Sequence, residues 1–289
     1  MKQTIAIIHF NTPELTEACI LSIRKQGCDW PVVVFDNSAD ITIPAGTDGN
    51  GPKEETIIKA RPFKQKMKGV KVIDNTKGQV IDFESTLAAF PNKTEAHAAV
   101  NGWGSDIHMM TVDKLFDLLP DGFILVESDL LLKADISTMW RDEYSFCAYV
   151  QRQQRGNKFG MGRILPMLCY LNVPKFKAEG VRYFDPDRSW MLHPDENDKR
   201  NWYDTGASLL EDVLAHRPRL KGLHVDIRPM VEHLGSGSYR KGLVAQAEWL
   251  KKHEALWTTV SDGSAVGKDS KPKTTKRANS KKKSFNDRI

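Results

Sequence analysis

The sequence predicts an α/β fold, with a mostly parallel sheet flanked by helices. The first observation is a strand–helix–strand pattern within residues 4–36, the length of a right-handed βαβ unit with parallel strands. The second is the short apolar run at residues 123–126, typical of a strand buried on both faces. The third is size, because 289 residues with 40% hydrophobic content suffice for a large core.

The elements of the first unit follow from local signals. Residues 4–10 form an apolar strand, and Thr12 followed by Pro13 is typical of the N-cap and first position of a helix, here reaching about Lys25. Residues 30–35 are a second buried strand. Parallel sheets bind ligands beyond the carboxyl ends of their strands. Asn11 and Asp36 follow the first and second strands, so we expect both to lie near a ligand.

Asp36 has two interpretations. It could accept hydrogen bonds from a nucleotide base or ribose, or it could cap the turn that follows its strand.

Residues 39–70 predict a surface loop and then a basic stretch, either a short helix or solvated chain. Residues 70–73 predict a third strand, and residues 109–119 a helix with one apolar face. His108, at the start of that helix, is expected to be structural rather than catalytic.

The apolar run at 123–126 ends abruptly in Glu127-Ser128-Asp129. Residues two apart on a strand point to the same side, so the two carboxylates could converge where the strand leaves the core. Carboxylates held close repel each other unless a cation or a proton lies between them. Mg²⁺ and Mn²⁺ prefer such oxygen ligands. The alternative is a strand that ends in a polar, solvated turn.

The following region predicts more of the sheet and one acidic helix start. Residues 145–150 form a strand, and the basic stretch 151–163 is either a lid over an anionic ligand or an ordinary loop. Residues 164–173 are apolar and are expected to pack in the sheet. Asp204 lies near the N-cap of a helix at 207–216, where a carboxylate is stabilised by exposed N–H groups. A plain capping role is the alternative.

Composition separates the body from a tail. After a last helix at 243–257, residues 261–289 contain nine Lys or Arg against three Asp, a net charge of +6 that leaves residues 1–260 at −1. With almost no apolar residue, this tail is expected to be disordered and able to bind an anionic membrane surface or nucleic acid. No apolar run is long enough to span a membrane, and the first residues predict a strand rather than a signal peptide. The cysteines show no CxxC spacing and predict free buried thiols in a reducing compartment.

The chain resembles the family 2 glycosyltransferases, which have a GT-A fold. That family opens with a strand, an Asn-containing turn, a helix with a Leu-Ser-(Leu/Ile)-x-x-Gln element, and a second strand ending in Asp near a Ser. Here the element reads Leu21-Ser-Ile-Arg-Lys-Gln26, and the second strand ends in Asp36-Asn-Ser38. Glu127-Ser128-Asp129 matches the family's metal-binding Asp-x-Asp, with Glu in place of the first Asp. The resemblance covers roughly residues 1–240 and implies a GT-A domain over residues 1–260.

The resemblance implies a metal site and a donor site. His233, which precedes a Gly/Ser loop, would complete the coordination of Mn²⁺ or Mg²⁺ by Glu127 and Asp129. Asp36 would contact the nucleotide of a nucleoside-diphosphate sugar. Three further residues would lie near this donor: Asn11, Gly104 and Ser128.

The same resemblance implies a general base at the start of a helix. Asp204 occupies that place, and Asp212, in the pair Glu211-Asp212, is the competing candidate. The expected function is metal-dependent transfer of a sugar, with inversion, to a hydroxyl of a glycan, a lipid-linked acceptor or a protein. The expected location is cytoplasmic, with the tail at the inner face of a membrane. The alternatives are an inactive nucleotide-sugar-binding protein, suggested by Glu127, and a protein that binds nucleic acid through its tail.

Overall fold

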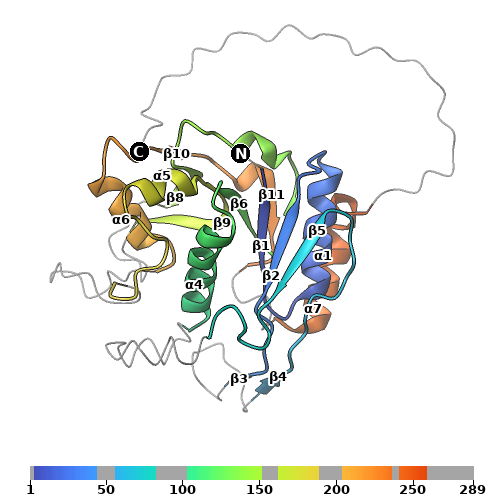
Figure 1. The fold of residues 1–289 in the computed structure, drawn as a ribbon. Coiled ribbons are helices and arrows are strands. Elements are labelled where there is room, and N and C mark those ends of the chain that lie inside the picture. The colour runs from blue at the N-terminus through green and yellow to red at the C-terminus, as the bar shows by residue number, and fades with distance from the viewer. Residues whose placement is uncertain are drawn as a thin grey trace, which may run out of the picture.

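A computed structural model of the chain describes residues 3–43, 56–82, 103–151, 162–188, 204–235 and 241–258. Within these residues the strands of the central sheet number seven (Figure 1). One strand, β9, runs antiparallel to both of its neighbours, and the other pairs are parallel. The predicted α/β class, with a mostly parallel sheet, is therefore confirmed. Across the sheet the order is β10 (Gly222–His224), β8 (Phe146–Gln151), β9 (Arg163–Leu171), β6 (Phe123–Glu127), β1 (Ile5–His9), β2 (Val32–Asp36) and β5 (Val70–Asp74).

The opening βαβ unit forms as predicted. Helix α1 (Pro13–Lys25) connects β1 to β2, and the two strands pair in parallel from Ile5 opposite Val32 to His9 opposite Asp36. Every residue of both strands is buried, as expected of strands covered on both faces. The predicted cap is only partly right, because Thr12 precedes the helix but its side chain makes no capping hydrogen bond.

Helices cover both faces of the sheet (Figure 1). One face packs against α4 (Trp103–Leu118), α5 (Val173–Ala178) and α6 (Ala207–Ala215), whose buried side chains form one apolar cluster with inward residues of β6 and β9. The other face packs against α1, and α7 (Gly242–Lys252) lies against α1 in turn. The sheet is therefore the middle of three layers, and its carboxyl edge is left for a site.

Two small sheets flank the main one. Strand β7 (Leu130–Leu132) pairs antiparallel with β11 (Val231–His233), and β3 (Ile41–Ile43) pairs with β4 (Thr56–Ile58). The expected surface loop after Asp36 thus includes a short two-stranded ladder, and the basic stretch up to Lys71 is extended rather than helical. Single 3-10 turns are η1 (Ile136–Met139), η2 (Arg228–Met230) and η4 (Glu254–Leu256).

Two expectations about element boundaries need correction, and a third is met. Helix α4 begins at Trp103 rather than near residue 109, so Gly104 lies within its first turn despite its weak helix propensity. The last helix ends at Lys252, and a 3-10 turn follows. The apolar stretch predicted at 164–173 is the antiparallel strand β9, which ends at Leu171.

Other expectations concern the chain's ends and its thiols. All four cysteines are free and buried, as predicted. No helix in the described part of the chain is both long and apolar enough to cross a bilayer. Most of the predicted lid, residues 152–161, and the whole predicted tail, residues 261–289, lie outside the described residues.

Candidate metal and substrate site

The acidic cluster forms where β6 leaves the core. Glu127 is the last residue of β6 and Asp129 follows in the turn before β7. The β7–β11 pairing sets His233 opposite Leu130, and the Leu234 amide donates to the Asp129 carbonyl over 3.2 Å. This small sheet therefore brings a residue from the C-terminal part of the chain beside the two carboxylates.

The three side chains lie within coordination reach of one another. His233 Nε2 is 3.4 Å from Asp129 Oδ2 and 3.6 Å from Glu127 Oε2. One ligand atom from each residue lies within 4.8 Å of the others. The structure thus gathers the three residues that the sequence proposes as metal ligands.

The electrostatics of this cluster are unfavourable without a cation. Burial and the charge of Asp129 together raise the pKa of Glu127 to about 7, against the lowering effects of His233 and Arg163. Burial alone would lower the pKa of His233, but Asp129 and Glu127 raise it above its ordinary value. Without a metal, Glu127 and His233 therefore tend to be protonated, whereas a bound metal ion would keep both deprotonated.

The geometry of His233 fits a metal. Its Nε2 atom is buried and, despite the short distances, forms no well-directed hydrogen bond to either carboxylate. A ring nitrogen between two carboxylates is placed as in a metal-binding imidazole, which must be deprotonated at that nitrogen when the metal is bound. Two carboxylates and one imidazole suit Mn²⁺ better than Ca²⁺.

Asp204 lies near this cluster, held by an ion pair. Its Oδ2 atom accepts from Arg163, while its Oδ1 atom accepts from the Thr205 amide over 2.7 Å. Asp204 and Arg163 are close enough for their charges to shift the pKa of Glu127, upward and downward respectively. The predicted capping role is wrong, because Gly206, with φ of 80°, occupies the N-cap of α6.

Asp212 is differently placed. Arg188 donates to its Oδ2 atom over 2.8 Å and to Glu211 over 2.7 Å. The charges that chiefly shift the pKa values of Glu127 and His233 come from other residues, among them Asp204 and Arg163. The structure therefore brings Asp204, rather than Asp212, to the acidic cluster.

Asn11 and Asp36 are buried at the carboxyl edge and bind backbone. Asn11, with φ of 55°, accepts from the Arg61 amide over 3.0 Å and donates to the Ala39 carbonyl over 2.7 Å. Asp36 accepts the Ser38 amide over 2.9 Å and the Phe63 amide over 2.8 Å. These contacts are those of the turn-capping alternative, and any donor contact would use the remaining lone pairs of Asp36.

The other two proposed donor residues lie at the same edge. Ser128 Oγ, between the two carboxylates in sequence, is 3.4 Å from Thr12 Oγ1 at the start of α1. Gly104 lies in the first turn of α4, the turn expected nearest the carboxyl edge because α4 leads back into β6. Sequence reasoning included Arg163 only as the end of a basic stretch and missed its ion pair with Asp204, which depends on long-range packing.

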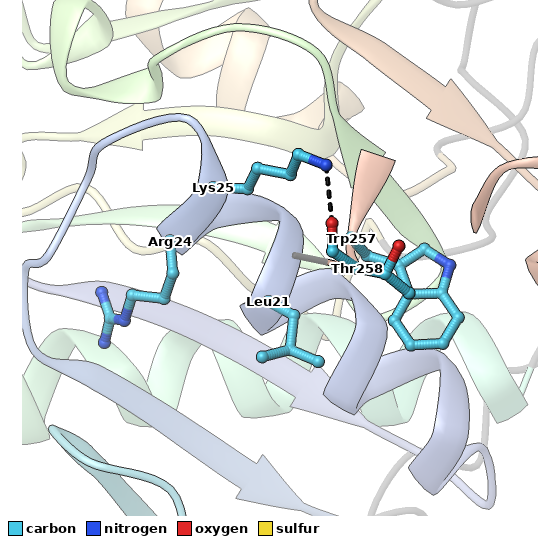
Figure 2. A pocket seen from close by; sticks show the side chains of 5 residues that line it. All are labelled: Leu21, Arg24, Lys25, Trp257 and Thr258. Carbon is cyan, nitrogen blue, oxygen red and sulfur yellow. Dashed lines mark hydrogen bonds between the residues drawn. The ribbon is translucent and has the colours of Figure 1, made fainter. Parts of the chain in front are cut away.

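A separate pocket lies at the far end of α1 (Figure 2). Lys25 crosses it, and its Nζ atom donates to the Thr258 carbonyl over 2.6 Å. Because α1 starts beside the carboxyl edge and runs back along the sheet, this pocket is remote from the acidic cluster. Its lining residues are Leu21, Arg24, Lys25, Trp257 and Thr258.

Comparisons with known proteins give only remote likenesses. No protein-family model and no curated protein matches the chain. The crystal structure of a galactosyltransferase, LgtC, in complex with donor and acceptor sugar analogues is 13% identical, covers 90% of this chain and 98% of its own, and gives a TM-score of 0.45. The glycosyltransferase GlyE of Streptococcus pneumoniae TIGR4 is 12% identical, covers 91% of this chain and 66% of its own, and gives 0.38. At such scores neither likeness carries an argument about activity, and membership of family 2 is not shown.

Proposed function

We propose that the chain is a metal-dependent glycosyltransferase that moves a sugar from a nucleoside-diphosphate donor to a hydroxyl acceptor. The observation that carries the proposal is the cluster of Glu127, Asp129 and His233, in which His233 Nε2 lies 3.4 Å from Asp129 and 3.6 Å from Glu127. It lies beyond the carboxyl end of a strand in a mostly parallel sheet, where such folds bind ligands. The resemblance of residues 5–38 to the opening of family 2 glycosyltransferases supports the same reading.

In this proposal the cluster prepares the leaving group. Glu127, Asp129 and His233 would hold Mn²⁺ or Mg²⁺, which supplies positive charge against the charge that develops on the departing diphosphate. Lys241 is a further cation nearby, because its charge acts on His233 and its ammonium donates to the Leu234 carbonyl. Asn11, Asp36, Gly104 and Ser128 would position the donor at the carboxyl edge.

Asp204 is the proposed general base. It would accept the proton of the acceptor hydroxyl as that oxygen attacks the anomeric carbon opposite the leaving group, which inverts the anomeric centre. Its ion pair with Arg163 would have to open or shift for the carboxylate to reach this proton. Asp212 is the weaker candidate because it lies within α6, further along the chain than Asp204, whose charge acts on Glu127. The acceptor is proposed to be a glycan, lipid-linked or protein hydroxyl, and the site of action the inner face of a membrane.

The proposal is tested by ligand-dependent stabilisation. We expect at least one nucleoside diphosphate to raise the melting temperature of the wild type in Mn²⁺ but not in EDTA, because a metal held by Glu127, Asp129 and His233 would supply positive charge for the diphosphate. Asp129→Ala should lose this shift, while Asp29→Ala, at an exposed carboxylate before β2, should retain it. A wild type that responds to no nucleoside diphosphate would contradict the proposal.

A second candidate is a nucleotide-sugar-binding protein without transferase activity. The engagement of both Asp204 oxygens and the presence of Glu at position 127 favour it. Hydrolysis of a nucleotide sugar in Mn²⁺ distinguishes the two, because an active transferase releases sugar slowly to water when no acceptor is present. Donor binding without any hydrolysis or transfer would support the second candidate.

A further inference from the structure

Large aliphatic side chains are exposed in the first turn of α7. In the described part of the chain, Leu243 is 57% exposed and Val244 is 73% exposed. Ala247, about one turn further along the same side of the helix, is exposed as well. The opposite side of α7 packs against α1 through Leu250. The exposed side chains are therefore not needed for the core, and the proposed function does not use them.

This apolar turn lies beside the acidic cluster. The Leu234 amide donates to the Asp129 carbonyl over 3.2 Å, and the Lys241 ammonium donates to the Leu234 carbonyl. His233 immediately precedes Leu234, and Leu243 is the second residue after Lys241. Two hydrogen bonds thus connect the turn that carries two of the candidate metal ligands to the start of α7. The exposed aliphatic side chains are at the same end of the molecule as the candidate site.

Cations flank the apolar turn. Lys241 immediately precedes α7, and Lys251 and Lys252 end it, so three exposed lysines accompany one exposed carboxylate, Glu248. Residues 261–289 follow in the sequence and add a net charge of +6. Aliphatic side chains bordered by lysines on a surface helix match a bilayer with anionic head groups. There the aliphatic groups enter the edge of the hydrocarbon and the lysines meet the phosphates.

A bilayer fits this surface better than a second copy of the chain or a nucleic acid. Two aliphatic side chains cover little of the about 800 Å² that a stable protein interface buries on each partner. A two-fold pairing of parallel α7 helices would also bring Lys251 and Lys252 against the same residues of the other copy, where like charges repel. Single-stranded nucleic acid is bound by aromatic side chains beside cations, and residues 243–247 contain no aromatic residue.

We propose that the first turn of α7 inserts into the surface of an anionic lipid bilayer and docks the protein there. Leu243 and Val244 would enter the bilayer, while Lys241, Lys251 and Lys252 would contact the head groups. Because this turn adjoins the metal cluster, docking would hold the candidate site at the membrane surface. For the acceptor the inference rests on the proposed function, and it selects the lipid-linked hydroxyl among the acceptors proposed above.

Co-sedimentation of the full chain with vesicles tests the docking, without nucleotide or metal. Vesicles of phosphatidylglycerol and phosphatidylcholine are compared with vesicles of phosphatidylcholine alone. We expect the wild type to bind the anionic vesicles, and Leu243→Ser/Val244→Ser to lose at least about tenfold in affinity for them. Leu118→Ser/Leu214→Ser is the matched control, since it removes leucines that are 40% and 45% exposed on α4 and α6, and it should bind as the wild type does. Both variants should keep the melting temperature of the wild type, because the side chains removed are exposed.

A fluorescent label tests whether this turn itself enters the bilayer. The four native cysteines are buried, so a thiol introduced by Val244→Cys can be labelled selectively with a dye whose emission depends on polarity. We expect the emission to shift to shorter wavelength on anionic vesicles. The same dye at Leu118→Cys, at the end of α4, should show no shift.

Several results would overturn the inference. The wild type might bind neither kind of vesicle, or Leu243→Ser/Val244→Ser might bind as tightly as the control, which would assign the binding to the tail alone. A wild-type dimer that Leu243→Ser/Val244→Ser dissociates, seen by analytical ultracentrifugation, would mean that a second copy covers this surface. A protein that docks on vesicles but binds no nucleoside diphosphate in Mn²⁺ would support the docking and contradict only the proposed function.

Discussion

Replacing Glu127 by Gln should stabilise the metal-free protein at alkaline pH. In the folded chain, burial and the neighbouring Asp129 raise the pKa of Glu127 to about 7, from an ordinary value of 4.5. The unfolded chain therefore loses this proton at a lower pH than the folded chain. The contribution of the protonated group to stability is present below about pH 4.5, falls as pH rises, and is lost above about pH 7.

The size of the effect follows from the difference between the two pKa values. Each pKa unit corresponds to about 1.4 kcal/mol, so the ionised Glu127 costs about 3 kcal/mol above pH 7. A glutamine resembles the protonated acid in shape and cannot ionise. The variant should come within about 1 kcal/mol of the wild type at pH 5 and exceed its free energy of unfolding by about 3 kcal/mol at pH 8.

The assay is urea unfolding in EDTA at pH 5 and pH 8. Glu248→Gln, at an exposed position on α7, is the matched control and should change stability little at either pH. Saturating Mn²⁺ should then stabilise the wild type more than Glu127→Gln, because the variant has lost a charged ligand. A gain that is the same at both pH values, or a loss at pH 8, would refute the account of the acidic cluster.

Three further predictions follow from the same region. Asp204→Asn should leave donor binding intact and lower the rate of transfer at least 100-fold, whereas Asp212→Asn should change it little; transfer at the wild-type rate by Asp204→Asn would disprove the base assignment. Because burial depresses the pKa of His108 to about 4, protonation of this residue should cost the wild type about 3 kcal/mol as pH drops from 6.5 to 4, while protonation of Glu127 offsets that loss; the free energy of unfolding of His108→Phe relative to the wild type, measured in urea, should therefore rise by about 3 kcal/mol over this range. Gly206→Ala should lower the free energy of unfolding by about 2–4 kcal/mol, because φ is 80° and the new Cβ would lie 2.1 Å from the Ile164 carbonyl oxygen; a neutral result would contradict this packing.

The parts of the fold that local patterns determine were predictable. The apolar runs at β1, β2 and β6 identify buried strands, and Thr12-Pro13 marks the start of α1 within a residue. The carboxylates at the end of β6 follow from the same pattern. The spacing of apolar residues describes one segment at a time, so it predicts those features that depend on a single strand or helix.

The remainder of the site depends on contacts between distant segments. Nothing near His233 shows that β11 pairs with β7, and that register is what brings His233 to Asp129. The ion pair of Arg163 with Asp204 likewise joins residues from β9 and the start of α6. Asp36 illustrates the converse, since its strand-end position was predictable but its two backbone partners were not.

Anomalous diffraction at the manganese edge tests the central claim most directly. The crystal would contain Mn²⁺ and the nucleoside diphosphate that most raises the melting temperature. We predict a peak bonded to Glu127, Asp129 and His233 together, at about 2.0–2.3 Å from each ligand atom. A peak elsewhere, or an ordered nucleotide with no manganese at this cluster, would contradict the account.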